Sequence, residues 1–430
     1  MFLCLVLFAS CLIQGADSRP LQSAPQAPAS ASHQVLTGID VIVDAGALWA
    51  VPGAKHNLEL VPRPVSCANR PCRLGLVTNM TGRDARGRRT IDLLARLPAV
   101  ELTAIFSPEH GLGGDQDTTA IANSRDVTTG VPIFSVYGAT DTSRRPPMPI
   151  LRGLDAVVFD LQDVGVRWYT YETTLGYFLE ACAAAKLPLI VLDRPNPING
   201  SVVAGAVSDA TRQSFVNYHP IPIRHGLTLG ELAQLFNGER RLGAELHVVR
   251  MRGWRREEWF DDTGLAWINP SPNLRSLEAA MLYPGVALVE GANVSVGRGT
   301  QTPFSLLGAP WIDGSRLAEY LHARAVSGIR FAPVSFTPSS GPYAGRLCHG
   351  IRMAVRQRNQ LDSPELGLEL AAALLKLYPR EFKPGRIAEM LAQQESFERL
   401  LRGDDPRQIA QTWRAGLQQF ELVRRKYLLY

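Results

Sequence analysis

The chain has 430 residues, of which 46% are hydrophobic and 20% are charged, and its formal net charge at pH 7 is +5. A chain of this length exceeds what one hydrophobic core usually organises, so we expect two domains. The composition is typical of a globular protein and excludes disordered and collagen-like chains. The basic residues are scattered along the sequence rather than clustered, which argues against nucleic acid as a partner.

Residues 1–32 are typical of a secretory signal peptide followed by a flexible leader. A short apolar run ends in small residues, and a stretch rich in proline, serine and alanine follows it. Because the run is too short to span a bilayer, we predict no stable membrane span and a location in the periplasm or outside the cell. Cys11 is a candidate for lipid attachment, which leaves a lipid-anchored form open.

The cysteines beyond the leader suggest one pairing. Cys67 and Cys72 flank the sequence ANRP, and in an oxidising compartment they can close a small disulfide loop. Two unpaired thiols in a surface loop are the alternative. Cys182 lies on an apolar helical pattern and is predicted to belong to the core.

Short apolar runs alternate with helical patterns in the first part of the chain. Strands are predicted in the segments RLGLVTN, LTAIFSP, PIFSVYG, LDAVVFDLQDVG and LPLIVLDRPNP. These runs are almost continuously apolar, which suits strands buried on both faces of a parallel sheet. Helical patterns such as TIDLLARL and TTLGYFLEACAAAKL separate them. The alternation predicts a doubly wound α/β domain over residues 33–277.

The pattern changes near Leu277. From there the sequence is typical of a smaller α+β unit, with helical patterns at SRLAEYLHARAV and LGLELAAALLKLYP. We therefore assign residues 278–430 to a second domain.

Polar side chains follow four of the predicted strands. In open α/β sheets, ligands bind beyond the carboxyl ends of the strands. The side chains at these ends are Thr78, Asn79, Glu109, His110, Asp160, Gln162, Asp163, Asp193, Arg194 and Asn196. We expect them to converge on one cleft. No glycine-rich dinucleotide motif opens a helix here, and GLGGDQD lacks the lysine of a phosphate loop, so no cofactor is predicted.

Long segments of the chain resemble one family of glycosidases. They include FSPEHGLGGDQD, VVFDLQDVGVRWYTYETTL, IVLDRPNPING and NPSPNLRSLEAAMLYPGVALVEGANVSVGRGTQTPF. From about residue 35 to the C-terminus, the sequence resembles the exo-acting β-N-acetylmuramidases of the NamZ type, glycoside hydrolase family 171. The resemblance implies an enzyme that removes N-acetylmuramic acid from the non-reducing end of peptidoglycan fragments. It also implies a Rossmann-like catalytic domain and a second domain that forms the other wall of the cleft.

Glycoside hydrolysis needs a carboxylic acid to protonate the leaving oxygen and, in most families, a second carboxylate; in some, the acetamido group of the substrate attacks instead. Glu109 is the candidate acid, because it follows a strand in a loop whose glycines allow close approach; an ordinary turn glutamate is the alternative. Glu290, at the end of an apolar strand-like run, is the first candidate for the second group. Asp160 and Asp163 are further candidates, although Arg167 can instead hold them as a structural ion pair.

Other residues are candidates for binding the sugar. Trp168, Tyr169 and Tyr171 are predicted to pack on the C–H faces of a sugar ring, with core packing as the alternative. Arg167, Arg194 and Arg298 are candidates for the lactyl carboxylate of muramic acid, since a guanidinium binds a carboxylate through two parallel hydrogen bonds. The remaining predicted binding residues are Asn79, His110, Asp193, Asn196, Asn273, Asn293 and Thr300.

Two other classes of function stay open. The side chains of Asp115, Asp117, Asp160, Asp163, Asp193 and His110 can be interpreted as ligands of a divalent metal. The sequence lacks two histidines one helical turn apart, so no metal is predicted. A non-catalytic cell-wall protein that binds sugars would retain the aromatic residues and arginines but would not need Glu109.

Overall fold

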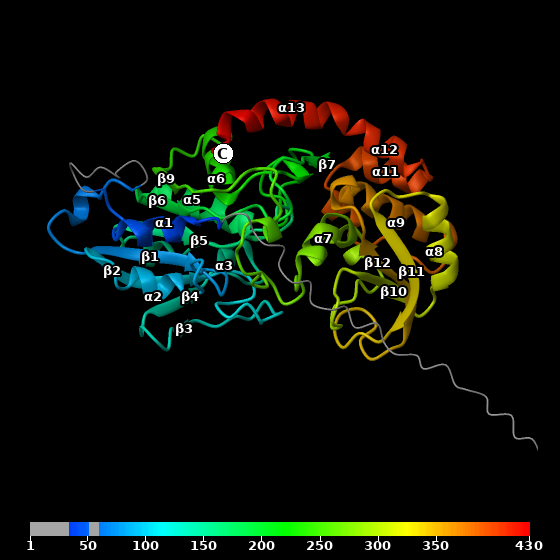
Figure 1. The fold of residues 1–430 in the computed structure, drawn as a ribbon, viewed down its shortest axis with the longest axis horizontal. Coiled ribbons are helices and arrows are strands. Elements are labelled where there is room, and N and C mark those ends of the chain that lie inside the picture. The colour runs from blue at the N-terminus through cyan, green and yellow to red at the C-terminus, as the bar shows by residue number, and fades with distance from the viewer. Residues whose placement is uncertain (1–33, 51–59) are drawn as a thin grey trace, which may run out of the picture.

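The computed structural model describes residues 34–50 and 60–430. It contains two units that lie side by side, and helix α13 runs from the second unit back across the first (Figure 1). The first unit is built on a seven-stranded sheet and the second on a three-stranded sheet. The predicted signal peptide and the candidate lipid-attachment site at Cys11 lie outside the described residues.

The seven-stranded sheet has the strand order β3-β4-β2-β1-β5-β6-β9. Its strands are β1 (Cys72–Thr78), β2 (Val100–Ser107), β3 (Ser124–Arg125), β4 (Pro132–Ser135), β5 (Ala156–Asp160), β6 (Leu189–Leu192) and β9 (Leu246–Val249). All neighbouring pairs are parallel except β3 with β4. This confirms the predicted doubly wound, mainly parallel sheet. After β1 the chain adds β2 and β4 on one side of this strand, and it then adds β5 and β6 on the other side. Folds of this kind bind ligands at the point between β1 and β5 where the order changes.

Helices pack on both faces of this sheet. They are α1 (Gly38–Ala45), α2 (Thr90–Leu94), α5 (Tyr171–Ala185) and α6 (Leu229–Glu239), with the short α3 (Asp141–Arg144) and α4 (Met148–Leu151) in the loops. Successive residues of β5 point to opposite faces: Val158 packs in the core that contains α1 and α2, and Val157 and Phe159 pack in the core that contains α5 and α6. Burial on both faces explains the continuous apolar runs.

The second unit carries the antiparallel sheet β10-β12-β11. Its elements are α7 (Leu277–Glu290), β10 (Leu306–Ala309), α8 (Gly314–Ala323), β11 (Ile329–Phe336), β12 (Cys348–Val355), α9 (Ser363–Leu377), α10 (Ile387–Leu391), α11 (Gln394–Arg402), α12 (Pro406–Thr412) and α13 (Arg414–Arg424). A two-stranded sheet, β7 (Ala204–Val207) with β8 (Pro222–Arg224), and the 3₁₀ helices η2 (Val65–Cys67), η3 (Phe260–Asp262), η4 (Arg358–Gln360) and η5 (Arg425–Tyr427) complete the chain. The smaller α+β unit is confirmed.

The apolar run before Glu290 is a helix, so its strand-like interpretation was wrong. It forms α7, which lies between the two units (Figure 1). Residues 279–289 are all buried. A helix that is covered on every side shows no amphipathic period, so its sequence resembles that of a buried strand.

The C-terminus packs on the first unit. The hydroxyl of Tyr430 donates a hydrogen bond of 2.7 Å to Asp193 and accepts one of 2.9 Å from the backbone N–H of Met251. Arg424 donates to the carbonyl of Gly226 at 2.9 Å. The chain therefore crosses between the units and returns.

The cysteines divide into one bonded pair and two buried thiols. Cys67 and Cys72 form a disulfide, and Cys72 is the first residue of β1. Cys182 and Cys348 are buried and unpaired, and Cys182 lies in the core as expected. None of the helices in the described part of the chain is both long and apolar enough to cross a bilayer.

Candidate active site

The loop after β2 turns sharply and presents Glu109. Strand β2 ends at Ser107, and the next turn places His110 at φ 71° and Gly111 at φ 75°. Glycine adopts this left-handed region without strain. At Gly114, with φ 72°, a Cβ atom would also lie 2.1 Å from the side chain of Met80. Tight turning and close packing together explain the glycines of this segment.

Two hydroxyl groups hold the carboxylate of Glu109. Tyr137, after β4, donates a hydrogen bond of 2.6 Å to Oε1, and Thr170, before α5, donates one of 2.5 Å to Oε2. Neither donor is charged, and within residues 34–50 and 60–430 no ion pair to Glu109 is found. Burial, and then the charge of Glu109, raises the pKa of Tyr137. Glu109 is half-buried, so its carboxyl group is oriented and still accessible.

Glu290 reaches the same loop through an arginine of the second unit. It is the last residue of α7, and Arg298 Nε donates to its Oε1. The Nη1 atom of Arg298 lies 3.3 Å from Oδ2 of Asp117, in the loop that begins with Glu109. Burial opposes the charge of Arg298, but the carboxylates of Glu290 and Asp117 outweigh it and raise the pKa of the guanidinium.

The carboxylates of Glu290 and Glu109 both act on the hydroxyl of Tyr283, which belongs to α7. Its pKa is raised by burial and then by the carboxylate of Glu290, with a smaller effect from Glu109. Tyr283 is not among the site residues predicted from the sequence, although its hydroxyl is the only polar side-chain group in the apolar stretch AMLYPGVALV. The two glutamates are thus brought to one region at the junction of the two units.

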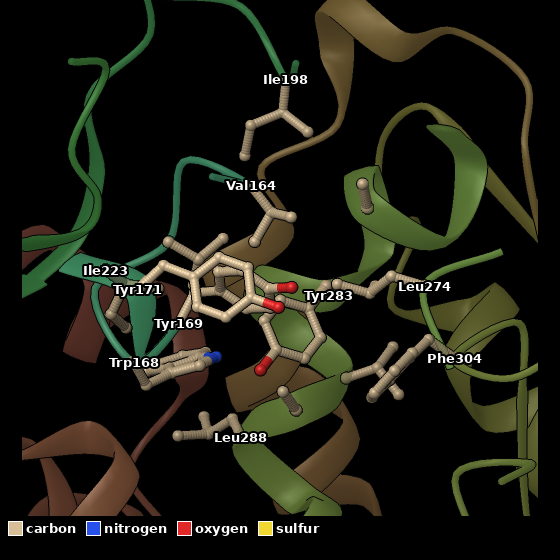
Figure 2. Packing of buried hydrophobic residues seen from close by; sticks show 14 of the residues in the cluster. Val164, Trp168, Tyr169, Tyr171, Ile198, Ile223, Leu274, Tyr283, Leu288 and Phe304 are labelled. Atoms are coloured by element: carbon tan, nitrogen blue, oxygen red, sulfur yellow. The ribbon is translucent and has the colours of Figure 1, made fainter. Parts of the chain in front are cut away.

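The aromatic residues before α5 are part of the core. Trp168, Tyr169 and Tyr171 are 2%, 6% and 0% exposed. Figure 2 shows the rings of Tyr169, Tyr171 and Tyr283 lying against one another, with ring centres 4.7 Å apart for the first pair and 6.2 Å for Tyr169 and Tyr283. The core alternative therefore holds, because buried rings offer no open face for the predicted stacking on a sugar.

Arg167 is a structural residue. It is fully buried, and burial lowers its pKa to about 10. Its guanidinium donates hydrogen bonds of 2.8–3.0 Å to the backbone carbonyls of Ala206, Ile221, Met390 and Leu391. Among the described residues Arg167 does not pair with Asp160 or Asp163, so that prediction was wrong. Its Nη donors are used by these carbonyls, which leaves its predicted contact with the lactyl carboxylate without support.

Asp160 is paired with Arg194 instead. Arg194 Nε and Nη2 lie 2.6 Å and 3.0 Å from its two carboxylate oxygens, and Thr90 donates a further bond of 2.5 Å. Asp160 is fully buried and Arg194 is 7% exposed. The pair joins the ends of β5 and β6, and Arg194 also lines a pocket there, so the roles predicted for these two residues stay predictions.

Asp163 lies beside a buried acid. Its Oδ2 accepts a bond of 2.6 Å from the N–H of Gly165 and is 3.7 Å from His225, whereas Oδ1 has no partner among the described residues. Glu172 is fully buried, and neither of its carboxyl oxygens has a hydrogen-bond partner there. Burial, and then the charge of Asp163, raises the pKa of Glu172 well above its usual value. Burial therefore disfavours the charged form of Glu172, although the nearby charge of Arg167 acts in the opposite direction.

Most of the other predicted binding residues are engaged by the protein itself. Asn79 bonds to Tyr171 and Thr81, His110 to Gln116, Asp193 to Thr228, Gly230 and Tyr430, Asn196 to Leu227 and Ile198, Asn293 to Glu381 and Lys383, and Thr300 to Gly297 and Thr302. Asn273 is 6% exposed in the loop that supplies the carbonyl of Pro270 to Tyr169 and Tyr171. These hydrogen bonds orient the side chains, and their contacts with a substrate stay predictions.

A cluster of metal ligands is not formed by the residues considered for that role. Within the described ranges, no three His, Cys, Asp or Glu side chains come together as ligands of one ion. Asp160 and Asp193 are instead surrounded by protein donors.

Comparisons with known proteins give one family for both units. Residues 74–278 match the family model described as exo-beta-N-acetylmuramidase NamZ, N-terminal, and residues 281–430 match the C-terminal model of the same family. The chain is 39% identical to the peptidoglycan beta-N-acetylmuramidase NamZ of Bacillus subtilis (strain 168) over 362 residues, which cover 83% of this chain and 87% of that protein. It is also similar to two crystal structures of DUF1343 family proteins from Bacteroides fragilis NCTC 9343. Their identities are 31% and 28% and their TM-scores 0.79 and 0.71, and each comparison covers 92% of this chain and 99% of the other.

Proposed function

The chain belongs to the NamZ family of exo-β-N-acetylmuramidases, and from this premise we propose that Glu109 is the proton donor of the reaction. The enzyme is a glycosidase that acts on peptidoglycan. We propose as its substrates disaccharides and muropeptides that carry N-acetylmuramic acid at the non-reducing end. One observation carries the assignment of Glu109: its carboxylate is held by two neutral hydroxyl groups, whereas Asp160 and Glu290 each face an arginine.

The hydroxyl donors suit the step that Glu109 would perform. As the bond between the anomeric carbon and the leaving oxygen breaks, the proton of Glu109 moves to that oxygen and a carboxylate remains. Tyr137 and Thr170 donate to both carboxylate oxygens, so they stabilise the charge that develops. Water then adds to the anomeric carbon and releases a proton to the solvent, and Glu109 takes up a proton from the solvent, which restores the acid.

We assign Glu290 to the positioning of the substrate. Its carboxylate already receives the Nε hydrogen bond of Arg298, so one of its oxygens is engaged by the protein. It also belongs to α7 of the second unit, so it can align the substrate against the loop that carries Glu109.

Steady-state assays test the proposal. We expect the purified protein to cleave a chromogenic glycoside of N-acetylmuramic acid much faster than the matching N-acetylglucosamine compound. The Glu109→Gln variant should lose turnover by about 10²–10⁴-fold and still bind the substrate. Cleavage of neither compound would reject the glycosidase proposal, and full activity of the variant would reject only the role of Glu109. Binding without turnover in both proteins would favour the sugar-binding alternative, and loss of activity in a strong chelator would favour the metal-dependent one.

We further propose that the protein acts in the periplasm or outside the cell. Residues 1–32 support this as a secretory leader, and the disulfide between Cys67 and Cys72 is of the kind that persists in oxidising compartments. Mass spectrometry of the protein from cell fractions is the test. A mature chain that lacks the leader is expected, with or without a lipid on Cys11, and an intact N-terminus in the cytoplasm would contradict the proposal.

A further inference from the structure

N-acetylmuramic acid differs from N-acetylglucosamine by a lactyl ether that carries a carboxylate. A site that distinguishes the two sugars needs an accessible cation that is not already engaged by carboxylates or carbonyls of the protein. The three arginines considered from the sequence do not meet this requirement, because Arg167 is bound to carbonyls, Arg194 to Asp160 and Arg298 to Glu290.

A hollow in the first unit contains such a cation. Its walls include α3, the loop that contains Phe215, part of α5 and Arg240 directly after α6, and its volume is about 320 Å³. Guanidinium groups lie over aromatic rings on three sides of it, as in cation–π pairs. The pairs are Arg144 with Phe215 at 4.2 Å, Arg145 with Tyr177 at 4.0 Å and Arg240 with Tyr218 at 4.3 Å, from guanidinium carbon to ring centre.

The charges in the hollow do not balance. Arg145 pairs with Asp141 at 2.8 Å and with Glu180 at 2.6 Å, and Arg240 also pairs with Glu180, at 3.3 Å. In the part of the chain that the structure describes, Arg144 forms no ion pair. Three guanidinium groups therefore face two carboxylates, and the remaining positive charge belongs to Arg144.

The geometry of Arg144 leaves its far end available. Its Nε donates a hydrogen bond of 2.8 Å to the carbonyl of Gly138, and its face rests on Phe215. These two contacts fix the plane of the guanidinium. The two Nη atoms have no hydrogen-bond partner among the described residues, and both Arg144 and Phe215 are partly exposed. Such an end can receive both oxygens of a carboxylate.

Two aromatic rings connect the hollow with the proposed proton donor. Tyr137, which donates to Glu109, has its ring centre 5.9 Å from that of Phe215. The charge of Arg144 also acts on the hydroxyl of Tyr137. A substrate whose glycosidic oxygen lies at Glu109 can therefore extend past Tyr137 to Arg144.

We propose that Arg144, supported by Phe215, binds a carboxylate of the substrate and is a specificity-determining residue of this enzyme. The inference rests on the proposed function. The carboxylate has two sources in peptidoglycan: the lactyl group of the sugar when it is free, and the peptide stem when the lactyl group is amidated. Both present the same planar anion to the guanidinium.

Kinetics with four chromogenic glycosides test the inference and separate the two sources. The sugars are N-acetylmuramic acid, its lactyl amide, a muramoyl dipeptide with a free stem carboxylate, and N-acetylglucosamine. For Arg144→Gln we expect KM to rise about 10–100-fold with the substrates whose carboxylate binds here and kcat to change little. With the lactyl amide and N-acetylglucosamine, KM should be the same for Arg144→Gln as for the wild type. Arg144→Lys should recover part of the affinity, because lysine restores the positive charge but not the two parallel hydrogen bonds of a guanidinium.

Two controls make the result decisive. Arg152→Gln changes an exposed arginine just after α4 and should behave as the wild type. Arg275 is exposed and donates to the carbonyls of Pro272 and Thr300. Arg275→Gln therefore tests whether a different exposed arginine, near the junction of the units, binds the carboxylate.

The outcomes are distinct. If KM of Arg144→Gln rises only with N-acetylmuramic acid, Arg144 binds the lactyl carboxylate. If it rises only with the muramoyl dipeptide, Arg144 binds the carboxylate of the peptide stem. Either result supports the inference. Equal loss with charged and uncharged sugars, or a charge-dependent loss only in Arg275→Gln, would overturn it. A wild-type protein that cleaves none of the four compounds would reject the proposed function instead. Binding of free N-acetylmuramic acid, measured by calorimetry, checks each variant independently of turnover.

Discussion

Arg298 of the second unit lies 3.3 Å from Asp117 of the first, between the Nη1 and Oδ2 atoms. The same guanidinium bonds to Glu290 at the end of α7. Asp117 belongs to the loop that begins with Glu109, so this contact fixes the loop of the proposed proton donor against the other unit. The position of Glu109 thus depends on how the units meet.

Replacement of Arg298 should therefore reduce activity more than stability. In Arg298→Gln we expect kcat/KM to fall by about tenfold or more, because small misplacements of a catalytic group are costly. The free energy of unfolding should change by about 1 kcal/mol or less, since Asp117 is largely exposed and such ion pairs contribute little. Kinetics and urea unfolding of the same preparation measure both quantities.

Arg358→Gln is the matched control. Arg358 also joins the units, through Asp261 at 2.6 Å and Asp262 at 3.2 Å, but on a surface that does not contain Glu109. It should leave turnover nearly unchanged. If both variants lost activity equally, the effect would come from a general loosening of the units and not from the loop of Glu109.

Tyr137→Phe tests the hydroxyl groups that hold Glu109. The substitution removes the donor to Oε1 and keeps the ring against Phe215. A hydrogen bond to a charged group contributes about 1.5–3 kcal/mol, so kcat should fall about 10–100-fold with a small change in KM. Thr170→Val removes the other donor and should have a similar effect.

The matched control for Tyr137 is Tyr427→Phe, which removes a hydroxyl bonded to Glu239 at 2.7 Å on α6. Its activity should equal that of the wild type. If Tyr137→Phe were equally active, the hydroxyl would have no part in stabilising the carboxylate left by proton transfer.

The sequence predicts the fold well where local pattern and burial agree. Continuous apolar runs at β1, β5 and β6 indicate strands covered on both faces, and the helices between them make the sheet parallel. The run that forms α7 misleads because it is buried on all sides and contains Pro284, which is typical of a strand end or a turn. Length alone distinguishes it, since fourteen residues exceed a usual buried strand.

The sequence predicts only part of the site, because some of its side chains depend on partners that are distant in the chain. Glu109 is recognisable because its turn is local, with His110 and Gly111 in the left-handed region directly after β2. The fate of each arginine depends on distant partners: Arg167 bonds to the carbonyl of Leu391, 224 residues away. Which guanidinium stays unpaired is a property of the whole fold, so Arg144 does not stand out in the sequence.

Asp193 should make the stability of the fold depend on pH. It is fully buried beneath the C-terminus, and burial raises its pKa from 3.8 to about 6, although hydrogen bonds from Gly230 and Thr228 oppose this. Between pH 4 and pH 6 the folded chain keeps a proton that the unfolded chain has lost. The stabilisation is therefore complete below about pH 4 and is lost as the pH rises through about 6. A shift of about two units corresponds to roughly 3 kcal/mol.

Asp193→Asn should remove this contribution, because an amide does not titrate and the hydroxyls of Thr228 and Tyr430 can accept from it. Urea unfolding of both proteins at pH 4, 5, 6 and 7 gives the difference in their free energies of unfolding, in which the effects of other titrating groups cancel. We expect the wild type to lose roughly 3 kcal/mol relative to the variant over this range. Glu172, whose pKa is also raised by burial, keeps a slope of the same sign in both proteins. A difference that stayed constant with pH, or grew in the opposite direction, would show that Asp193 is already ionised at pH 4 in the folded chain.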